Sequence, residues 1–386
     1  MAKLLEITGK AISGEWGQDD DTGTGIPVLR TTNFTNEGFV NYKNVVTRSI
    51  SKKNIAEKYL RHGDVIIEKS GGSDKQPVGR VIFFEGEENK YLFNNFTGLL
   101  RVQNPEEWLP KYVFYALYAY YRNGGTRAFE NRTTGLHNLQ VDNYVKSVDI
   151  PKLSYRKQQH ICETLDHVRD AVAYRERQLT KLDELIKARF VEMFGDPKDN
   201  RSNLVKIGEI GDLTSGGTPS RSNSEYFNGS IRWYSAGELN SLYLPDSIEH
   251  ISKTALSQSA AKLFEKGTLM IGMYDTAAFK MGILTEQSSS NQACANLKPT
   301  EQYSVIWLYY LFDIMKPIFL NERQGVRQKN LSLSKIRNFN IPSAPIDLQN
   351  NFAAFVERVE QQRQTVQRSL EKLELMKKAL MQEYFG

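Results

Sequence analysis

Cysteine is nearly absent from this chain. Only Cys162 and Cys294 occur among 386 residues, and neither belongs to a CxxC pair or stands beside a cluster of histidines. Disulfide scaffolds and structural zinc sites need several closely spaced thiols, so this distribution argues against both. It fits a reducing compartment, and we expect a cytoplasmic protein.

Long hydrophobic runs are lacking as well. The longest apolar stretch, VIWLYYLFDIM (305–315), is about half as long as a helix that crosses a bilayer. The first residues, MAKLLEITGK (1–10), contain no apolar core of a secretion signal. We therefore expect no membrane association.

No excess of one charge dominates the composition. The 50 Lys and Arg residues against 45 Asp and Glu residues give a net charge of +5, which permits a nucleic-acid partner without requiring one. The 19 tyrosines and 19 phenylalanines indicate folded domains rather than a disordered chain. The length predicts two or three domains, each with its own core.

One stretch, residues 158–195, carries the heptad pattern of a coiled coil. Its seam positions alternate steps of four and three from Ile161 to Met193, and no proline or glycine occurs before Gly195. This pattern predicts a long helix with one apolar face. The apolar seam residues are Leu165, Val168, Val172, Leu179, Leu182 and Ile186.

The chain is also duplicated. LVKIGEIGDLTSGG (204–217) corresponds to LLEITGKAISG (4–14), and the ending Phe194-Gly195 recurs as Phe385-Gly386. The repeating unit is therefore large, and the second copy ends in a second long helix. Its apolar seam residues are Val356, Val359, Val366, Leu370, Leu373 and Leu380.

The two helices complement each other at their charged seam positions. Arg175 corresponds to Val366, and Lys377 to Ile186. Either the helices are matched to pair with each other, or these are edge positions where long charged stems lie over apolar surface. Each helix is about 50 Å long at 1.5 Å per residue. We favour an antiparallel pair, because a parallel one needs a connection as long as the helix.

These patterns predict an α+β fold. Two tandem mixed α/β domains are separated by two long helices, which form an intramolecular antiparallel coiled coil with a pseudo-two-fold repeat. The predicted ranges are 1–155 for the first domain, 156–195 for the central helix, 196–204 for a linker, 205–346 for the second domain and 347–386 for the C-terminal helix. Within the first domain, SKKNIAEKYL (51–60) is predicted to be a short helix capped by Ser51.

The order of these pieces resembles the specificity subunits of type I restriction-modification systems. The motifs that carry the resemblance are GDVIIEK (63–69) with its copy KGTLMI (266–271), the loop RQGVRQKNLS (323–332), and the helix ending ARFVEMFGDP (188–197). Ile-Pro followed some seven residues later by Gln-Gln or Gln-Asn occurs in both copies. Each motif alone is weak, but their duplicated order covers essentially the whole chain.

The resemblance implies a sequence-specific DNA-binding subunit. Each domain would be a target-recognition domain for one half of a bipartite double-stranded site, and two methyltransferase subunits would dock on the helices. Restriction and translocation subunits would join through the methyltransferases. S-adenosylmethionine, ATP and magnesium are then expected on those partners, with no cofactor and no metal in this chain.

The residues themselves argue against catalysis. An amino-methyltransferase needs Pro-Pro-aromatic after Asn or Asp, and neither NPEE (104–107) nor DPK (196–198) has it. TGTG (22–25) lacks the following helix of a cofactor loop, and Asp64 and Glu68 lack the spacing of a metal nuclease. A non-enzyme is predicted. The alternative is a coiled-coil scaffold that joins two protein-interaction domains and does not bind DNA.

Loops rich in Arg, Lys, Asn, Gln, Ser and Thr supply the candidate DNA contacts, since such side chains hydrogen-bond base edges and phosphates. We single out the loop with Arg327 and interpret Asn138 and Asn330 as caps of the elements that follow them. The candidates in the first domain are Arg30, Thr31, Thr32, Asn33, Lys69, Ser70, Ser73, Lys75, Arg132, Thr133, Thr134 and His137. Those in the second are Ser235, Glu238, Asn240, Tyr274, Asp275, Lys280, Arg323, Gln324, Arg327, Gln328 and Lys329.

Overall fold

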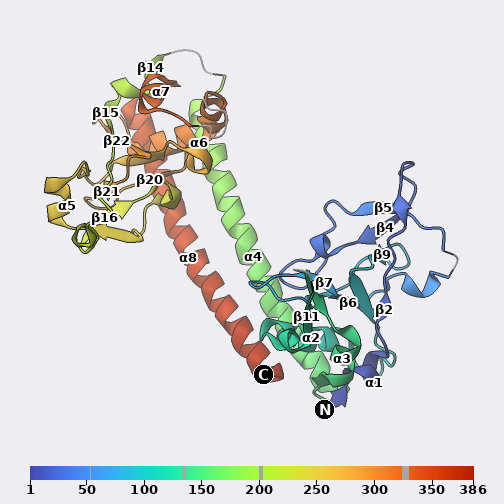
Figure 1. Ribbon diagram of the computed structural model, residues 1–386. Coiled ribbons are helices and arrows are strands. Elements are labelled where there is room, and N and C mark those ends of the chain that lie inside the picture. Colours follow the sequence, from blue (N-terminus) through green and yellow to red (C-terminus); the bar gives the residue numbers. More distant parts are fainter. Residues whose placement is uncertain (53, 134–135, 200–202, 324–329) are drawn as a thin grey trace. The chain divides into compact units, whose positions relative to one another are not determined.

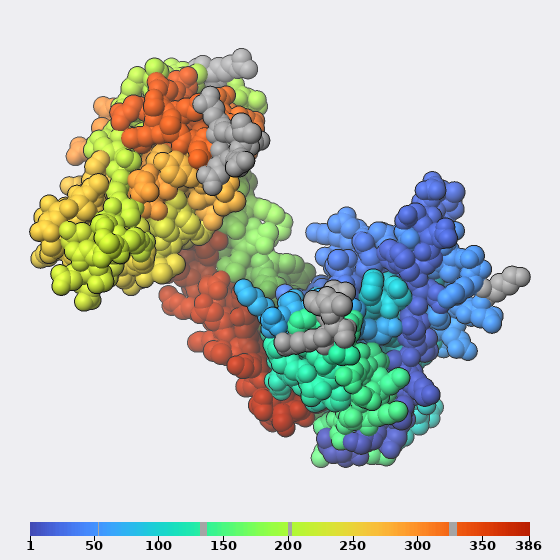
Figure 2. All heavy atoms as spheres, in the orientation of Figure 1, coloured from blue at the N-terminus to red at the C-terminus, as the bar shows by residue number. Residues whose placement is uncertain are grey.

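The computed structural model describes residues 1–386 except 53, 134–135, 200–202 and 324–329. The side chains of residues 132, 133 and 136 are also outside the described part. The chain forms two compact units (Figure 1). Unit 1 comprises Met1–Arg175 and Ser369–Gly386, and unit 2 comprises Glu176–Arg368. The domain of each unit is one continuous stretch of sequence, blue to green in unit 1 and yellow-green to orange in unit 2 (Figure 2).

Both units share the two long helices, α4 (Tyr155–Phe194) and α8 (Ile346–Phe385). The other helices and strands of unit 1 are β1 (Ala2–Lys3), α1 (Leu4–Thr8), β2 (Ile12–Ser13), β3 (Gln18–Asp19), β4 (Ile26–Leu29), β5 (Val46–Ser49), β6 (Val65–Glu68), β7 (Ser70–Gly72), β8 (Val81–Phe83), β9 (Leu92–Phe93), β10 (Thr97–Leu100), α2 (Pro110–Arg122), β11 (Glu130–Thr133), β12 (Leu136–Leu139), α3 (Val141–Ser147) and β13 (Asp149–Ile150). Its 3-10 turns are η1 (Thr31–Asn33), η2 (Ala56–Lys58) and η3 (Gly125–Phe129).

Unit 2 repeats this order. Its helices and strands are β14 (Leu204–Lys206), β15 (Gly211–Ser215), β16 (Ile231–Tyr234), β17 (Asn240–Tyr243), β18 (Glu249–Ile251), α5 (Lys253–Gln258), β19 (Leu269–Gly272), β20 (Met281–Ile283), β21 (Ser289–Ser290), β22 (Cys294–Pro299), α6 (Val305–Asn321), α7 (Leu333–Asn338) and β23 (Asn340–Pro342). Its 3-10 turns are η4 (Ile207–Glu209), η5 (Ser224–Phe227), η6 (Ala236–Glu238) and η7 (Asp275–Ala277).

The main sheets of the two units share an order of four strands, and that of unit 2 has a fifth strand, β17, at one edge. The main sheet has the order β2-β10-β6-β8 in unit 1 and β15-β22-β19-β20-β17 in unit 2. A second sheet contains one parallel pair in each unit, β4 with β9 and β16 with β21. The central strands β6 and β19 are buried along their whole length, which explains their continuous apolar runs. The predicted duplicated α+β fold is confirmed.

The helices α4 and α8 run antiparallel within unit 2. Asp183 of α4 pairs with Arg363 of α8, and further along α4 the Phe190 ring lies 5.3 Å from that of Phe352. Advancing along α4 therefore means moving back along α8, which excludes the parallel alternative. In unit 1 the first half of α4 and the last residues of α8 share one hydrophobic core.

The predicted seam residues of both helices are all buried or half-buried. Their surroundings differ from those of a simple coiled coil, because Leu165 and Ile186 also belong to the cores of the domains. The charged seam residue Arg363 is half-buried and binds Glu360 at 3.0 Å as well as Asp183. Burial raises the pKa of Glu360, and Arg363 opposes this shift. At this position the seam holds an ion pair.

SKKNIAEKYL does not form the predicted helix. Only the 3-10 turn η2 is present between Ala56 and Lys58 in the described part of this stretch. The corresponding stretch of unit 2 does form a helix, α5, and the Ser252 hydroxyl accepts the Ala255 N–H at its start. The predicted helix is therefore wrong for SKKNIAEKYL, although its counterpart in unit 2 is helical.

Each long helix is fixed to its domain by one buried glutamine. The side chain of Gln158 accepts the Leu109 N–H at 2.8 Å and donates to the carbonyl oxygens of Glu107 and Leu153 at 2.9 and 3.0 Å. Gln349 makes the equivalent three bonds, accepting the Ser304 N–H at 2.9 Å. This glutamine is the first polar residue of the Gln-Gln and Gln-Asn motifs. Among the described residues, no helix is both long and apolar enough to span a membrane.

We predict that Gln158→Ala lowers the free energy of unfolding by about 3 kcal/mol, because it leaves a buried N–H and two carbonyl oxygens unpaired. Gln159→Ala is the matched control, since its side chain is exposed, and it should change stability by less than about 0.5 kcal/mol. Urea denaturation followed by circular dichroism measures both. An equal loss in the two variants would show that Gln158 is not an anchor.

The two cysteines are free and buried. Burial raises the pKa of both thiols to about 12. A raised thiol pKa leaves almost no thiolate near neutral pH, so we predict that both react with Ellman's reagent on the order of a thousandfold more slowly than a free cysteine. Two thiols should react at the ordinary rate after denaturation. Fast reaction of either thiol in the folded protein would contradict this burial.

Candidate nucleic-acid interface

In unit 1, three separate segments that contain candidate residues meet at one end of the main sheet. Strand β12 pairs with β7, which places His137 opposite Gly72. The Arg80 guanidinium, next to β8, donates to the Thr31 carbonyl oxygen at 3.2 Å and so joins the β7–β8 loop to the turn η1. The fold thus brings together the turn at 30–33, the loop at 69–80 and the β11–β12 hairpin.

Unit 2 gathers the corresponding segments in the same way. Strand β17 lies parallel to β20 with Asn240 opposite Met281, so the turn η6 adjoins the loop between β19 and β20. The third segment is attached through Asn330, whose side-chain oxygen accepts the Asp275 N–H at 2.9 Å. Asn330 therefore holds a neighbouring loop, and the cap of α7 is Ser332 instead.

Two equivalent candidates are held inside their turns. The Asn33 side chain accepts the Arg30 N–H at 3.0 Å, and Glu238 accepts the Ser235 N–H at 2.8 Å. Asn33 is 1% exposed, and its amide group also donates to two backbone carbonyl oxygens. Glu238 also accepts the Ser235 hydroxyl and the Ile248 N–H. In this structure both side chains shape the turn that carries their neighbours.

Two further candidates of unit 1 have partners within the protein. His137 is 8% exposed, and its ring nitrogens lie 3.2 Å from Glu130 and 3.8 Å from Asp74. The Lys69 ammonium donates to the Ser13 hydroxyl at 2.8 Å, and burial lowers the pKa of Lys69. These contacts order the base of the β7–β8 loop.

The remaining candidates divide by accessibility. The exposed ones are Thr32, Ser73, Lys75, Asn240, Tyr274 and Asp275. The half-buried ones are Arg30, Thr31, Ser70, Ser235, Lys280 and Arg323. Arg132 and Thr133 lie in β11, and their side chains are outside the described part. The candidates Thr134, Gln324, Arg327, Gln328 and Lys329 lie outside the described residues altogether.

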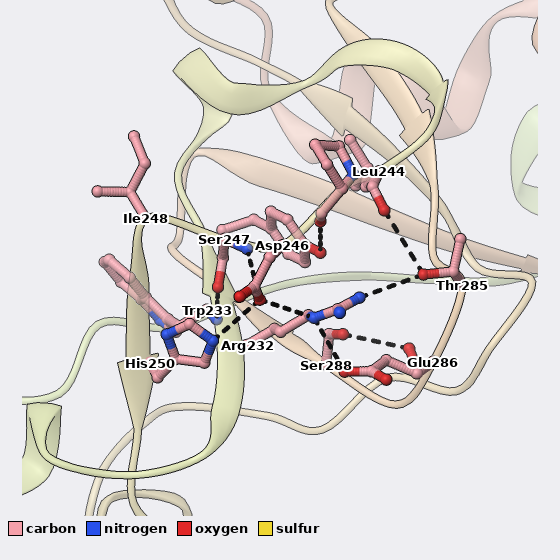
Figure 3. Close-up of polar contacts among 12 residues, drawn as sticks. Arg232, Trp233, Leu244, Asp246, Ser247, Ile248, His250, Thr285, Glu286 and Ser288 are labelled. Carbon is pink, nitrogen blue, oxygen red and sulfur yellow. Dashed lines mark hydrogen bonds and ion pairs between the residues drawn. The ribbon is translucent and has the colours of Figure 1, made fainter. Parts of the chain in front are cut away.

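A polar network that the sequence did not suggest supports the turn η6 (Figure 3). Arg232 lies 2.9 Å from both Asp246 and Glu286, and Asp246 also accepts from His250 at 3.0 Å. Ser247 accepts the Trp233 N–H at 3.1 Å. The network holds the 244–250 segment against β16.

This segment presents an exposed residue beside the turn. The Ile248 N–H donates to Glu238 at 2.8 Å, whereas its side chain is 83% exposed and points away from the polar network (Figure 3). The sequence gives no signal for this network, because Arg232, the 246–250 stretch and Glu286 are far apart along the chain.

Glu238→Gln tests the structural role of this carboxylate. The amide would place an N–H group against one of the N–H donors, so we predict a loss of about 1–3 kcal/mol in the free energy of unfolding. Hydrogen exchange at the Ser235 and Ile248 amides should accelerate. The exposed Glu301→Gln is the control in the same unit. Unchanged protection of both amides would contradict the proposed role of Glu238.

The sequence of this chain is similar to those of known proteins. A family model for the type I restriction modification DNA specificity domain matches residues 200–375. The type I restriction enzyme MjaIX specificity subunit of Methanocaldococcus jannaschii is 29% identical over 119 residues, covering 30% of this chain and 27% of that protein. The EcoR124I/EcoR124II specificity subunit of Escherichia coli is 24% identical over 170 residues, covering 42% and 41%. The matched stretches are thus less than half of either relative.

Solved structures extend the similarity to the whole fold. The S subunit of a type I restriction-modification system from M. genitalium matches 100% of this chain and 95% of that chain, with a TM-score of 0.59 and 15% identity. A chain from a study of complex assembly and conformational transition of the type I R-M system matches 100% and 96%, with a TM-score of 0.59 and 17% identity. At these identities the likeness concerns the fold alone. The family model and the curated relatives each match less than half of this chain, and both show similarity to specificity subunits of type I restriction-modification systems, as does the fold.

Proposed function

We propose that this chain is the DNA-binding specificity subunit of a type I restriction-modification complex and that each domain binds one half of a split site. The observation that carries the proposal is the equivalent clustering of three polar segments at one sheet end of each unit. Hydroxyl, amide and guanidinium groups at such an end can bond base edges in the major groove and backbone phosphates.

In this proposal the chain directs adenine methylation or restriction but performs neither. The acidic residues nearest to a nuclease pattern have structural partners, because Asp64 is bound by Arg101 and Glu68 by Arg80. S-adenosylmethionine, ATP and magnesium belong to the partner subunits. This chain contributes the selection of the site.

The long helices are the proposed docking surface for two methyltransferase subunits. In unit 2 an open groove of about 960 Å³ lies along α4 and α8. Its lining includes Leu185, which is 47% exposed, together with Phe355 and Arg358. Exposed apolar side chains rimmed by charges are typical of protein interfaces. Restriction subunits would bind through the methyltransferases.

The modular division of the site can be tested with one exposed residue from each domain. We predict that Thr32→Ala relaxes recognition at one half-site and that Tyr274→Ala relaxes it at the other, each by about 1–3 kcal/mol per affected base pair. Coexpression of the chain with its methyltransferase, followed by genome-wide mapping of methylated adenines, measures both halves at once.

Three outcomes would contradict the proposal. Methyl transfer by the purified chain alone would show that it is an enzyme. Equal loss at both half-sites in each variant would exclude separate recognition by the two domains. Duplex binding that is absent, or that does not weaken with salt, would favour the scaffold alternative, since phosphate contacts make affinity fall steeply as salt rises.

A further inference from the structure

We propose that a hollow in unit 1 binds a backbone phosphate of the target DNA, with Arg122 and Arg127 as its ligands. The inference rests on the proposed function and deepens it. Neither arginine belongs to the polar loops of the sequence analysis. The hollow has a volume of about 410 Å³ and lies between the β7–β8 loop and the end of α2.

The charge of the hollow is strongly positive. Four cations line it, Lys75, Arg80, Arg122 and Arg127, and no carboxylate is among the described lining residues. Arg80 is bound through two 3.0 Å hydrogen bonds to Glu68, which neutralises it. Within the described chain, the other three cations form no ion pair with a carboxylate, so they are available to a phosphate.

The neighbouring carboxylates, among them Glu37 near Tyr118, lie outside the lining of the hollow. Asp74 precedes Lys75, but its carboxylate is directed to His137 at 3.8 Å. The end of α2 would oppose an anion through its free carbonyl oxygens. Two of these oxygens are already bonded, since the Asn123 N–H donates to Ala119 and the Gly124 N–H to Tyr121, each at 2.9 Å.

The position of the hollow favours DNA over a free anion. Arg80, in its wall, donates to the Thr31 carbonyl oxygen, so the hollow adjoins the turn that carries Thr32. Lys75 belongs to the same loop as Ser73, another exposed candidate. Arg122 and Arg127 are themselves exposed, and Arg127 also donates to the Asp74 carbonyl oxygen at 3.4 Å, which holds it at the β7–β8 loop. Guanidinium groups in such positions suit a phosphate.

The first experiment measures duplex affinity of the full-length chain as a function of salt. Arg122→Gln and Arg127→Gln should each weaken binding about three- to tenfold at low salt, equally for cognate and unrelated duplexes, and lower the salt slope by about one. Lys146→Gln, an exposed substitution on α3 outside the hollow, should change neither quantity. The inference would be overturned if both variants kept the salt slope of the wild type. If the wild type still bound its cognate duplex more tightly than an unrelated one, the proposed function would stand.

The second experiment separates a phosphodiester from a free anion. Single phosphates of the cognate duplex are replaced by neutral methylphosphonates, and the wild type should lose affinity at one or two neighbouring positions. The double variant Arg122→Gln, Arg127→Gln should be insensitive at those positions. The inference would be overturned if the wild type bound inorganic phosphate but the double variant lost affinity at the same methylphosphonate positions as the wild type. Absence of salt-dependent binding to every duplex would instead overturn the proposed function.

Discussion

The structure depends on two helices that each contribute to two hydrophobic cores. The first half of α4 packs into the core of unit 1 and its second half into that of unit 2, while α8 does so in the reverse order. The first domain is therefore completed by residues from the far end of the sequence, and the ring of Phe385 lies 5.4 Å from that of Tyr112. A core that requires both helices stabilises their pairing within one chain. This requirement also explains why the apolar stripe widens near the domains, where Ile186 and Phe190 are both fully buried.

The buried glutamines make the attachment of helix to domain directional. Apolar contacts alone would tolerate rotation of a helix, because they are not directional. Gln158 and Gln349 each use both ends of the amide, and a buried amide loses its bonds if the helix turns. The same three-bond pattern in both copies indicates that the two domains meet their helices in the same local geometry.

Sequence periodicity was sufficient for the long helices and the duplication, since heptads and a constant offset are long-range signals. It did not reveal Phe190, which lies beside the 3.5-residue seam but is buried against Trp307. It also misjudged SKKNIAEKYL, because a short helical pattern is decided by tertiary packing. Loop chemistry was the hardest to predict. Asn33 and Glu238 have the composition of DNA contacts, yet only the structure shows that their side chains bond the backbone of their own turns.

These two turns show how a duplicated domain can preserve its backbone while its surface changes. In each, a side chain three residues beyond the turn's first N–H accepts that N–H, and both an asparagine and a glutamate can do so. Only the residue that accepts the N–H must have a suitable side chain. The two residues between the donor and the acceptor take no part in this hydrogen bond. Thr31-Thr32 occupies these positions in one copy and Ala236-Gly237 in the other. Only the second of these positions is exposed in both copies, as Thr32 and Gly237, whereas Ala236 is buried, so the second position can change without a loss of the turn. The proposed recognition of two different half-sites requires this property.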